Sequence, residues 1–118
     1  MIIKDEADVI RRCLASAKPL IDTWVIVDTG STDGTQEIVR EFMKDIPGVL
    51  YERPWKNFAH NRNEALELAR DKADYILIID ADEAFEYEPD YRFPPLDKNL
   101  YYITTKYGGM RYERAQLI

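Results

Sequence analysis

Two carboxylates separated by one residue, Asp80 and Asp82, follow directly after the apolar run Tyr75–Ile79. In an extended segment, side chains at positions i and i+2 point to the same side of the chain. Carboxylate oxygens are the ligands that Mg²⁺ and Mn²⁺ prefer, and water and a diphosphate can complete the shell. The pair therefore favours a divalent-cation site. The alternative is a solvated acidic loop that also includes Glu83 and Glu86.

A second candidate segment, Val27–Thr35, contains two glycines and several small polar residues, and it follows the apolar run Trp24–Val27. Glycines allow the backbone to approach a ligand closely, and Asp28 can accept hydrogen bonds from a base or a ribose. Asp33 has a structural alternative, because its position three residues before Gln36 resembles a capping box. We expect Asp28 to contact a ligand, and Asp33 stays open between ligand binding and helix capping.

Arg62 is the third candidate. At helical spacing it shares a face with Ala65, Leu66 and Ala69, so its guanidinium lies along an apolar stripe near the start of a helix. A helix N-terminus adds positive potential at that end. The guanidinium needs a partner, which is either a substrate phosphate or a carboxylate such as Asp80, and the sequence leaves both open.

The elements that position these residues follow from the hydrophobic periodicity, which alternates between strand and helix. Such an alternation implies parallel strands joined by crossover helices. We therefore expect an α/β fold, with a mostly parallel sheet sandwiched by helices. Ligands bind beyond the carboxyl ends of such strands, where all three candidates lie. Strands are expected at 1–4, 24–27, 49–52 and 75–79, helices at 5–17, 35–44 and 59–72, and a C-terminal β-hairpin at 100–106 and 110–117 around Gly108 and Gly109.

The composition is that of one folded domain. Its 118 residues are 46% hydrophobic and carry a net charge of −6, without a block of lysines or arginines, which argues against a nucleic-acid partner. No apolar run approaches the ~20 residues of a transmembrane helix, and no secretion leader opens the chain. Cys13 has no cysteine to pair with, which suits a reducing cytoplasm. We expect a cytoplasmic protein, and exposed sheet edges leave a homodimer open.

Four segments together resemble glycosyltransferase family 2: Met1–Glu6, Trp24–Thr35, Asn61–Ala65 and Ile78–Glu83. The similarity covers residues 1–85 in the right order and spacing, and its most specific part is Val-Asp-x-Gly-Ser-Thr-Asp-Gly-Thr. It implies the GT-A fold, which is Rossmann-like, and transfer of a sugar from a nucleotide diphosphate sugar, usually a UDP-sugar. The transfer would be inverting and assisted by Mn²⁺ or Mg²⁺. The acceptor would be a saccharide, a lipid or a protein.

The resemblance also implies roles for single residues. Asp80 and Asp82 would be the catalytic acidic pair, with Asp82 on the metal and Asp80 near the ribose or sugar. Thr29 stands where many members have a second aspartate, and Asp5 replaces the commoner asparagine. The residues implied to bind the nucleotide sugar are Ile2, Lys4, Asp28, Thr29, Asp33, Arg62 and Asp80.

The general base of this family usually lies further along the chain, in the acceptor-binding half. We therefore expect one domain over 1–118, in which 1–85 form the donor-binding core. Residues 86–118 would form a connection and a hairpin that begin an acceptor half, with the base outside this chain. Such a chain would bind its donor and turn over poorly alone.

Three other classes of protein are alternatives to this interpretation. A sugar nucleotidyltransferase needs a Gly-rich, basic loop after the first strand, which residues 5–17 do not offer. A receiver-like signalling domain needs an acidic pair there and a lysine after the fifth strand. Asp5 and Glu6 imitate the former weakly, and the latter is absent. A catalytically incomplete nucleotide-binding or scaffold module stays open.

Overall fold

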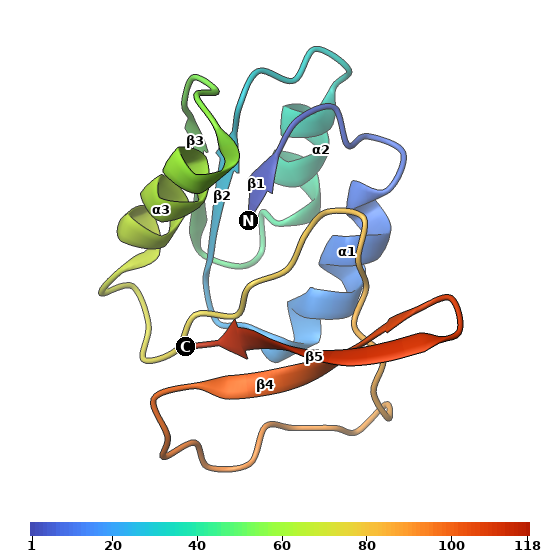
Figure 1. The fold of residues 1–118 in the computed structure, drawn as a ribbon. Helices are drawn as coiled ribbons and strands as arrows, with labels where there is room; N and C mark the ends of the chain where they lie inside the picture. Colours follow the sequence, from blue (N-terminus) through green and yellow to red (C-terminus); the bar gives the residue numbers. More distant parts are fainter.

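A computed structural model describes residues 1–118, and in it helices cover both faces of a parallel β-sheet (Figure 1). The strand order is β1–β2–β3, with β1 at Ile2–Ile3, β2 at Trp24–Asp28 and β3 at Gly48–Glu52. The central strand β2 pairs in parallel with both neighbours. Ile26 and Val27 of β2 are buried, as a continuous apolar run in a covered sheet requires. The expected α/β class is confirmed.

Two of the three α-helices pack against one face of the sheet, and the third covers the other face (Figure 1). Helices α1, at Ile10–Ala17, and α2, at Thr35–Phe42, lie on the first face, and a short 3₁₀ turn at Lys18–Leu20 follows α1. Helix α3, at Phe58–Ala69, lies on the second. The main core is formed by apolar side chains from α1, α2, the sheet and the loop after residue 79, namely Ile3, Ile10, Leu14, Ile26, Val39, Met43 and Ala81.

The first helix begins five residues later than the sequence predicts. Asp5 has a φ of +52°, in the left-handed region, so it does not begin an α-helix. Its backbone N–H donates to Ser31 Oγ, and its carboxylate accepts from the Thr32 N–H. The expected helix cap at Asp5 is therefore wrong, because Asp5 binds the loop after β2 instead, and α1 starts at Ile10.

The prediction that residues 75–79 form a fourth strand of the parallel sheet is also wrong. The extended segment 75–79 does not join the parallel sheet, but bonds to the last residues of the chain in an antiparallel sense. Ile76 exchanges backbone hydrogen bonds with Ile118, Ile78 N–H donates to the Gln116 carbonyl, and Leu77 forms a bridge with Leu117. A mostly apolar cavity of about 360 Å³ lies between this segment and the sheet.

The C-terminal hairpin is confirmed. Strand β4, at Tyr101–Tyr107, pairs antiparallel with β5, at Met110–Leu117. Gly108 takes a φ of +58° in the connecting turn, a conformation that glycine adopts without steric cost. None of the helices has both the length and the apolar character needed to span a membrane.

Candidate active site

The loops after β1 and β2 are hydrogen-bonded to each other at the carboxyl edge of the sheet. Asp5 N–H donates to Ser31 Oγ at 2.8 Å, and the Thr32 N–H donates to Asp5 Oδ1 at 2.8 Å. The Glu6 N–H donates to Thr35 Oγ1 at 3.0 Å. These bonds hold two segments that are distant in the sequence as one surface. We call this surface, with Arg62 and Asp80–Asp82, the carboxyl-edge rim.

Asp28 is 1% exposed, and its carboxylate is directed into its own loop. It accepts hydrogen bonds from the N–H groups of Gly30 and Ser31, from Ser31 Oγ and from Gln36 Nε2. Burial alone would raise the pKa of Asp28, but the bonds from Ser31 and Gln36 lower it below its usual value. The ionised carboxylate therefore shapes the loop, and its oxygens accept hydrogen bonds from the protein itself.

Thr29 and Asp33 have internal partners too. Thr29 is buried, and both its N–H and its hydroxyl donate to the Ile3 carbonyl, at 3.0 and 3.1 Å. Asp33 accepts from the hydroxyl and the N–H of Thr35 at the start of α2, and from the Ala7 N–H. The Thr35 hydroxyl is the main reason that the pKa of Asp33 is lowered. The N-cap of α2 is Gly34 without a side-chain cap bond, and the Gln36 side chain bonds to Asp28 and Glu52, so the expected capping box is not formed, although Asp33 does bind the first residue of α2.

The residues expected at the end of the first strand lie on the same edge. Ile2 pairs with Val27, and Lys4 follows β1 as an exposed residue whose ammonium makes no ion pair. Lys4 therefore leaves a positive charge free at the rim.

Arg62 and Asp80 are brought together from α3 and from the loop after residue 79. Arg62 Nη2 lies 3.7 Å from Asp80 Oδ1, a long ion pair between side chains that are 35% and 43% exposed. The guanidinium carbon lies 4.7 Å from the centre of the Phe58 ring, which supports the group from one side. Arg62 Nε is buried and has no hydrogen-bond partner. A guanidinium has five N–H donors, and this one makes a single long ion pair while 35% of the side chain is exposed, so its outer N–H groups retain capacity for an anion.

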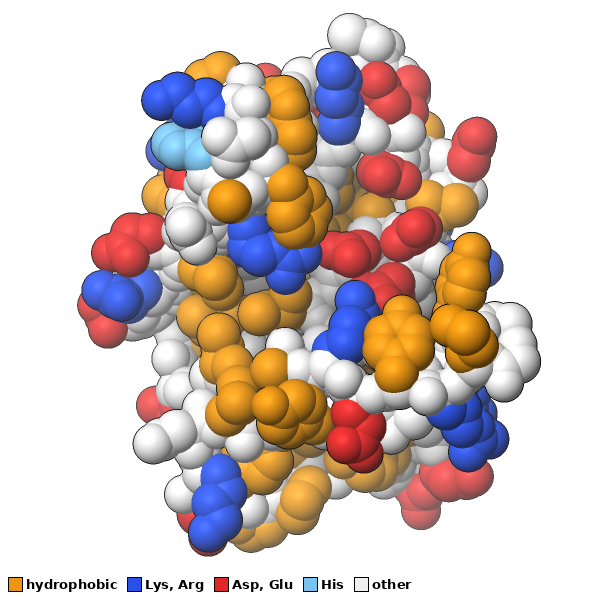
Figure 2. All heavy atoms as spheres, in the orientation of Figure 1, with side chains coloured by type: hydrophobic (Ala, Val, Ile, Leu, Met, Phe, Trp, Pro, Cys, Tyr) orange, Lys and Arg blue, Asp and Glu red, His pale blue; other side chains and the backbone are white.

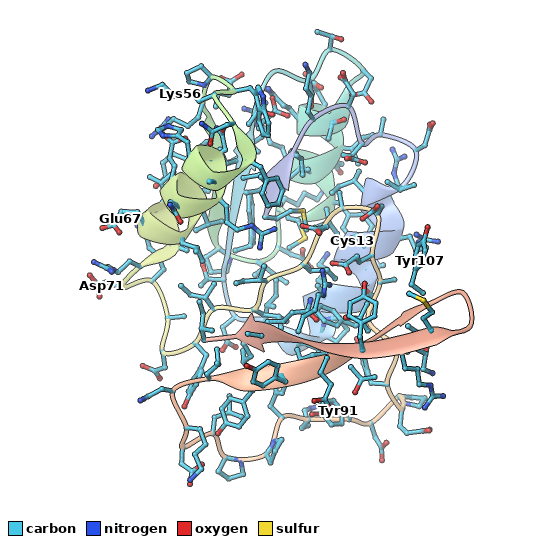
Figure 3. The ribbon with its side chains drawn as sticks, in the orientation of Figure 1. Cys13, Lys56, Glu67, Asp71, Tyr91 and Tyr107 are labelled. Atoms are coloured by element: carbon cyan, nitrogen blue, oxygen red, sulfur yellow. The ribbon has the colours of Figure 1, made fainter.

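The Asp80–Asp82 segment is anchored by its backbone. The Asp80 carbonyl accepts from the thiol of Cys13, which lies beside this loop in Figure 3, and the Asp82 carbonyl accepts from Arg12 Nη2 at 2.9 Å. Burial raises the pKa of the Cys13 thiol to about 12, so the thiol stays protonated as a donor. Ala81 is buried in the core. The Asp82 side chain is exposed and free of hydrogen bonds, as a ligand for a cation should be.

No group of three or more His, Cys, Asp or Glu side chains is close enough to hold a metal ion alone. A Mg²⁺ or Mn²⁺ ion that works with substrate phosphates commonly takes only one or two protein carboxylates and keeps several waters. The free carboxylate of Asp82, with Asp80 two residues away, fits such an ion in donor type.

Glu6 is a rim residue that sequence reasoning missed. The pKa of Glu6 is raised, first by burial and then by the negative charges of Asp82, Asp33 and Asp80. Glu6 thus feels the negative charges of two other loops, and Figure 2 shows acidic and basic side chains gathered near the middle of one face of the molecule. The available signal was the position of Glu6 just after β1, at the same edge as the other candidates, although the sequence pattern placed it in a helix.

The apolar cavity borders the rim but differs from it in chemistry. Arg62 and Asp80 lie at its margin, while 22 of its 28 lining residues are hydrophobic. Such a lining offers few donors for a diphosphate. The polar rim, rather than the cavity, is therefore the candidate site for a charged ligand.

This fold and rim define an α/β domain of the GT-A-like type. The model of the glycosyl transferase family 2 matches residues 1–96, so the chain belongs to this family. The resemblance seen in the sequence is thereby confirmed.

Several curated proteins are similar to this chain in sequence. A TPR repeat-containing protein of Synechococcus elongatus is 40% identical over 84 residues, which are 70% of this chain and 19% of that protein. The SPbeta prophage-derived glycosyltransferase SunS of Bacillus subtilis is 34% identical over 89 residues, 75% of this chain and 20% of the relative. An uncharacterized glycosyltransferase of Rickettsia felis is 30% identical over 117 residues, 99% of this chain and 37% of the relative. The chain thus spans between 19% and 37% of these relatives.

Proposed function

We propose that this domain binds a nucleotide diphosphate sugar, with UDP as the nucleotide, and serves a metal-assisted, inverting transfer of the sugar to an acceptor. Membership of glycosyl transferase family 2 supports glycosyl transfer in general. The observation that supports the donor site is the partly exposed Arg62 guanidinium, which has only a long ion pair to Asp80, two residues before the free Asp82 carboxylate.

Arg62 binds the diphosphate in this proposal. Its planar guanidinium can donate two parallel hydrogen bonds to phosphate oxygens, which a lysine ammonium does not do in the same geometry. Asp80 holds the Nη2 side at 3.7 Å, and Phe58 supports the face of the group. The Arg62 side chain is 35% exposed, so the outer N–H groups of the guanidinium can meet the phosphate, and charge that develops on the departing diphosphate is stabilised by a preoriented cation.

Asp82 holds the divalent cation, and Asp80 lies beside it near the ribose or sugar. A bound Mn²⁺ or Mg²⁺ supplies further neutralisation of charge on the leaving diphosphate. Backbone anchors from Arg12 and Cys13 keep the segment in place, so that metal binding does not require the loop to order first. The carboxylates of Asp28 and Asp33 contribute by fixing the neighbouring loop.

The acceptor and the general base are assigned to no residue of 1–118. In an inverting transfer, a base takes the proton of the acceptor nucleophile while the sugar leaves the diphosphate. Saccharide, lipid and protein acceptors each remain compatible with the rim.

Calorimetric titration of the chain with UDP, UDP-sugars and the corresponding GDP compounds, each with and without Mn²⁺, tests the proposal. We expect UDP compounds to bind only when Mn²⁺ is present. Metal-independent binding would contradict the role of Asp82, and no binding of any nucleotide would leave a scaffold module in its place.

A further inference from the structure

Glu83 connects the Asp80–Asp82 segment to the hairpin. Its Oε1 accepts a hydrogen bond from the backbone N–H of Asp80 at 2.9 Å, while its Oε2 is bound to Arg114 Nη2. One carboxylate therefore joins the residue beside Arg62 to a strand more than thirty positions away in the sequence. The Glu83 side chain is only 25% exposed, which shields the contact from solvent.

Arg114 is itself oriented by the hairpin. It lies on β5 opposite Ile103 of β4, and its Nε donates to Thr105 Oγ1 at 3.1 Å. One hydrogen bond within the hairpin thus orients the guanidinium, independently of its contact with Glu83. Since β-hairpins are marginally stable alone, a contact of this kind also orders the hairpin against the body.

We propose that the Glu83–Arg114 pair is a positioning device that sets the Asp80–Asp82 segment for the donor cation and diphosphate. This inference rests on the proposed function, and it concerns two residues to which the family resemblance assigns no role. Arg114 orients Glu83, Glu83 holds the Asp80 N–H, and the Asp80 carboxylate then faces Arg62. The hairpin therefore acts on the donor site without contacting the donor.

A second ion pair between the same two parts of the chain provides a matched control. Lys106 Nζ of β4 lies 3.1 Å from Glu86 Oε2, with side chains 55% and 76% exposed. Glu86 accepts no hydrogen bond from the Asp80–Asp82 backbone. If any ion pair that attaches the hairpin to the rest of the domain were sufficient, loss of either pair would change UDP affinity to a similar extent. A positioning role predicts an effect for Arg114 and almost none for Lys106.

The test compares three proteins with the wild-type chain: Arg114→Gln, Lys106→Gln and the charge-exchange double variant Glu83→Arg/Arg114→Glu. Two quantities are measured, namely the dissociation constant for UDP with Mn²⁺ and the amide hydrogen-exchange rate of Asp80 without ligand. In Arg114→Gln, we expect both to rise about tenfold, because a hydrogen bond to a charged group is lost. In Lys106→Gln, we expect both to stay within about twofold, since exposed pairs contribute little.

The charge-exchange variant separates positioning from simple attachment. It restores an ion pair between the loop and the hairpin, but an arginine at 83 has no acceptor for the Asp80 N–H. We expect it to regain thermal stability relative to Arg114→Gln while Asp80 exchange and UDP affinity stay impaired. Recovery of UDP affinity in this variant, or unchanged Asp80 exchange in Arg114→Gln, would overturn the proposal. If the wild-type chain binds no UDP while Arg114→Gln still speeds Asp80 exchange, the donor assignment fails and the positioning of the loop stands.

Discussion

Arg62 on α3 and Asp80 on the loop after residue 79 lie 3.7 Å apart, Nη2 to Oδ1, at the carboxyl edge of the sheet. This distance is long for an ion pair, and the neighbouring Nε of Arg62 is buried without a partner. Asp80 therefore orients the guanidinium without saturating it. The arrangement suits a group that must receive a phosphate.

Replacement of Arg62 tests the phosphate contact. Arg62→Ala should weaken UDP binding in the presence of Mn²⁺ between about 10- and 100-fold, because hydrogen bonds to charged groups contribute about 1.5–3 kcal/mol. Arg62→Lys should recover only part of the affinity, since it keeps the charge but loses the planar fork. Calorimetry measures both. Arg70→Ala is the control, because Arg70 follows the same helix and pairs only with exposed Glu67. Equal losses in Arg62→Ala and Arg70→Ala would count against a direct contact.

Trp24 on the neighbouring strand packs so closely over Gly48 that no side chain fits at this position. A Cβ at Gly48 would lie 2.2 Å from Trp24 Cδ2, and the indole N–H is held by the Ile46 carbonyl at 2.8 Å. Gly48→Ala should therefore lower the free energy of unfolding by about 1–3 kcal/mol, as overpacking does. Urea denaturation followed by tryptophan fluorescence measures the change. Gly109→Ala, where a Cβ meets nothing within 4 Å, should be almost neutral.

The lowered pKa of the Asp28 carboxyl predicts that the free energy of unfolding depends on pH. The pKa of its carboxyl is lower in the folded chain than its ordinary value, because Ser31 and Gln36 hydrogen bonds outweigh burial. Its stabilising effect is therefore complete above the ordinary pKa of about 3.9 and declines as the pH falls toward the folded value. Asp28→Asn should lower the free energy of unfolding at pH 7, and the difference from wild type should shrink below about pH 4.

Urea denaturation at several pH values checks this prediction, and Asp22→Asn, at an exposed site, is the control. A difference between Asp28→Asn and wild type that stays constant down to pH 3 would show that the charge of Asp28 has no part in holding the loop.

Local patterns predicted the elements whose partners are close in the sequence. The hairpin follows from two alternating segments around Gly108 and Gly109, and β2 follows from the apolar run Trp24–Val27. The rim was expected because carboxyl ends of parallel strands share an edge. Arg62 and Asp80 do lie together, but this is not due to a shared parallel-strand edge, because segment 75–79 bonds to the end of β5 and not to the parallel sheet.

Local sequence patterns could not predict hydrogen-bond partners that are distant in the sequence, because tertiary contacts select them. The apolar run Tyr75–Ile79 indicates an extended segment but does not say which edge it joins, and it bonds to the end of β5. Asp5 resembles a helix cap, yet its bonds to the loop after β2 select a left-handed conformation. The inward direction of the Asp28 carboxylate depends on Gln36, eight residues later, which a strand-end pattern does not reveal.

The most direct test of the account is where Mn²⁺ binds when UDP is present. Mn²⁺ broadens the resonances of nearby amide protons, so substoichiometric Mn²⁺ with UDP should first broaden Ala81, Asp82 and Glu83, and then Glu6. Gly108 and Gly109 at the hairpin turn should be unaffected. Asp82→Asn, at an exposed position, should remove the broadening without altering the rest of the spectrum. Broadening that persists in Asp82→Asn, or that centres on the acidic segment 86–90, would contradict the assignment of the rim as the donor site.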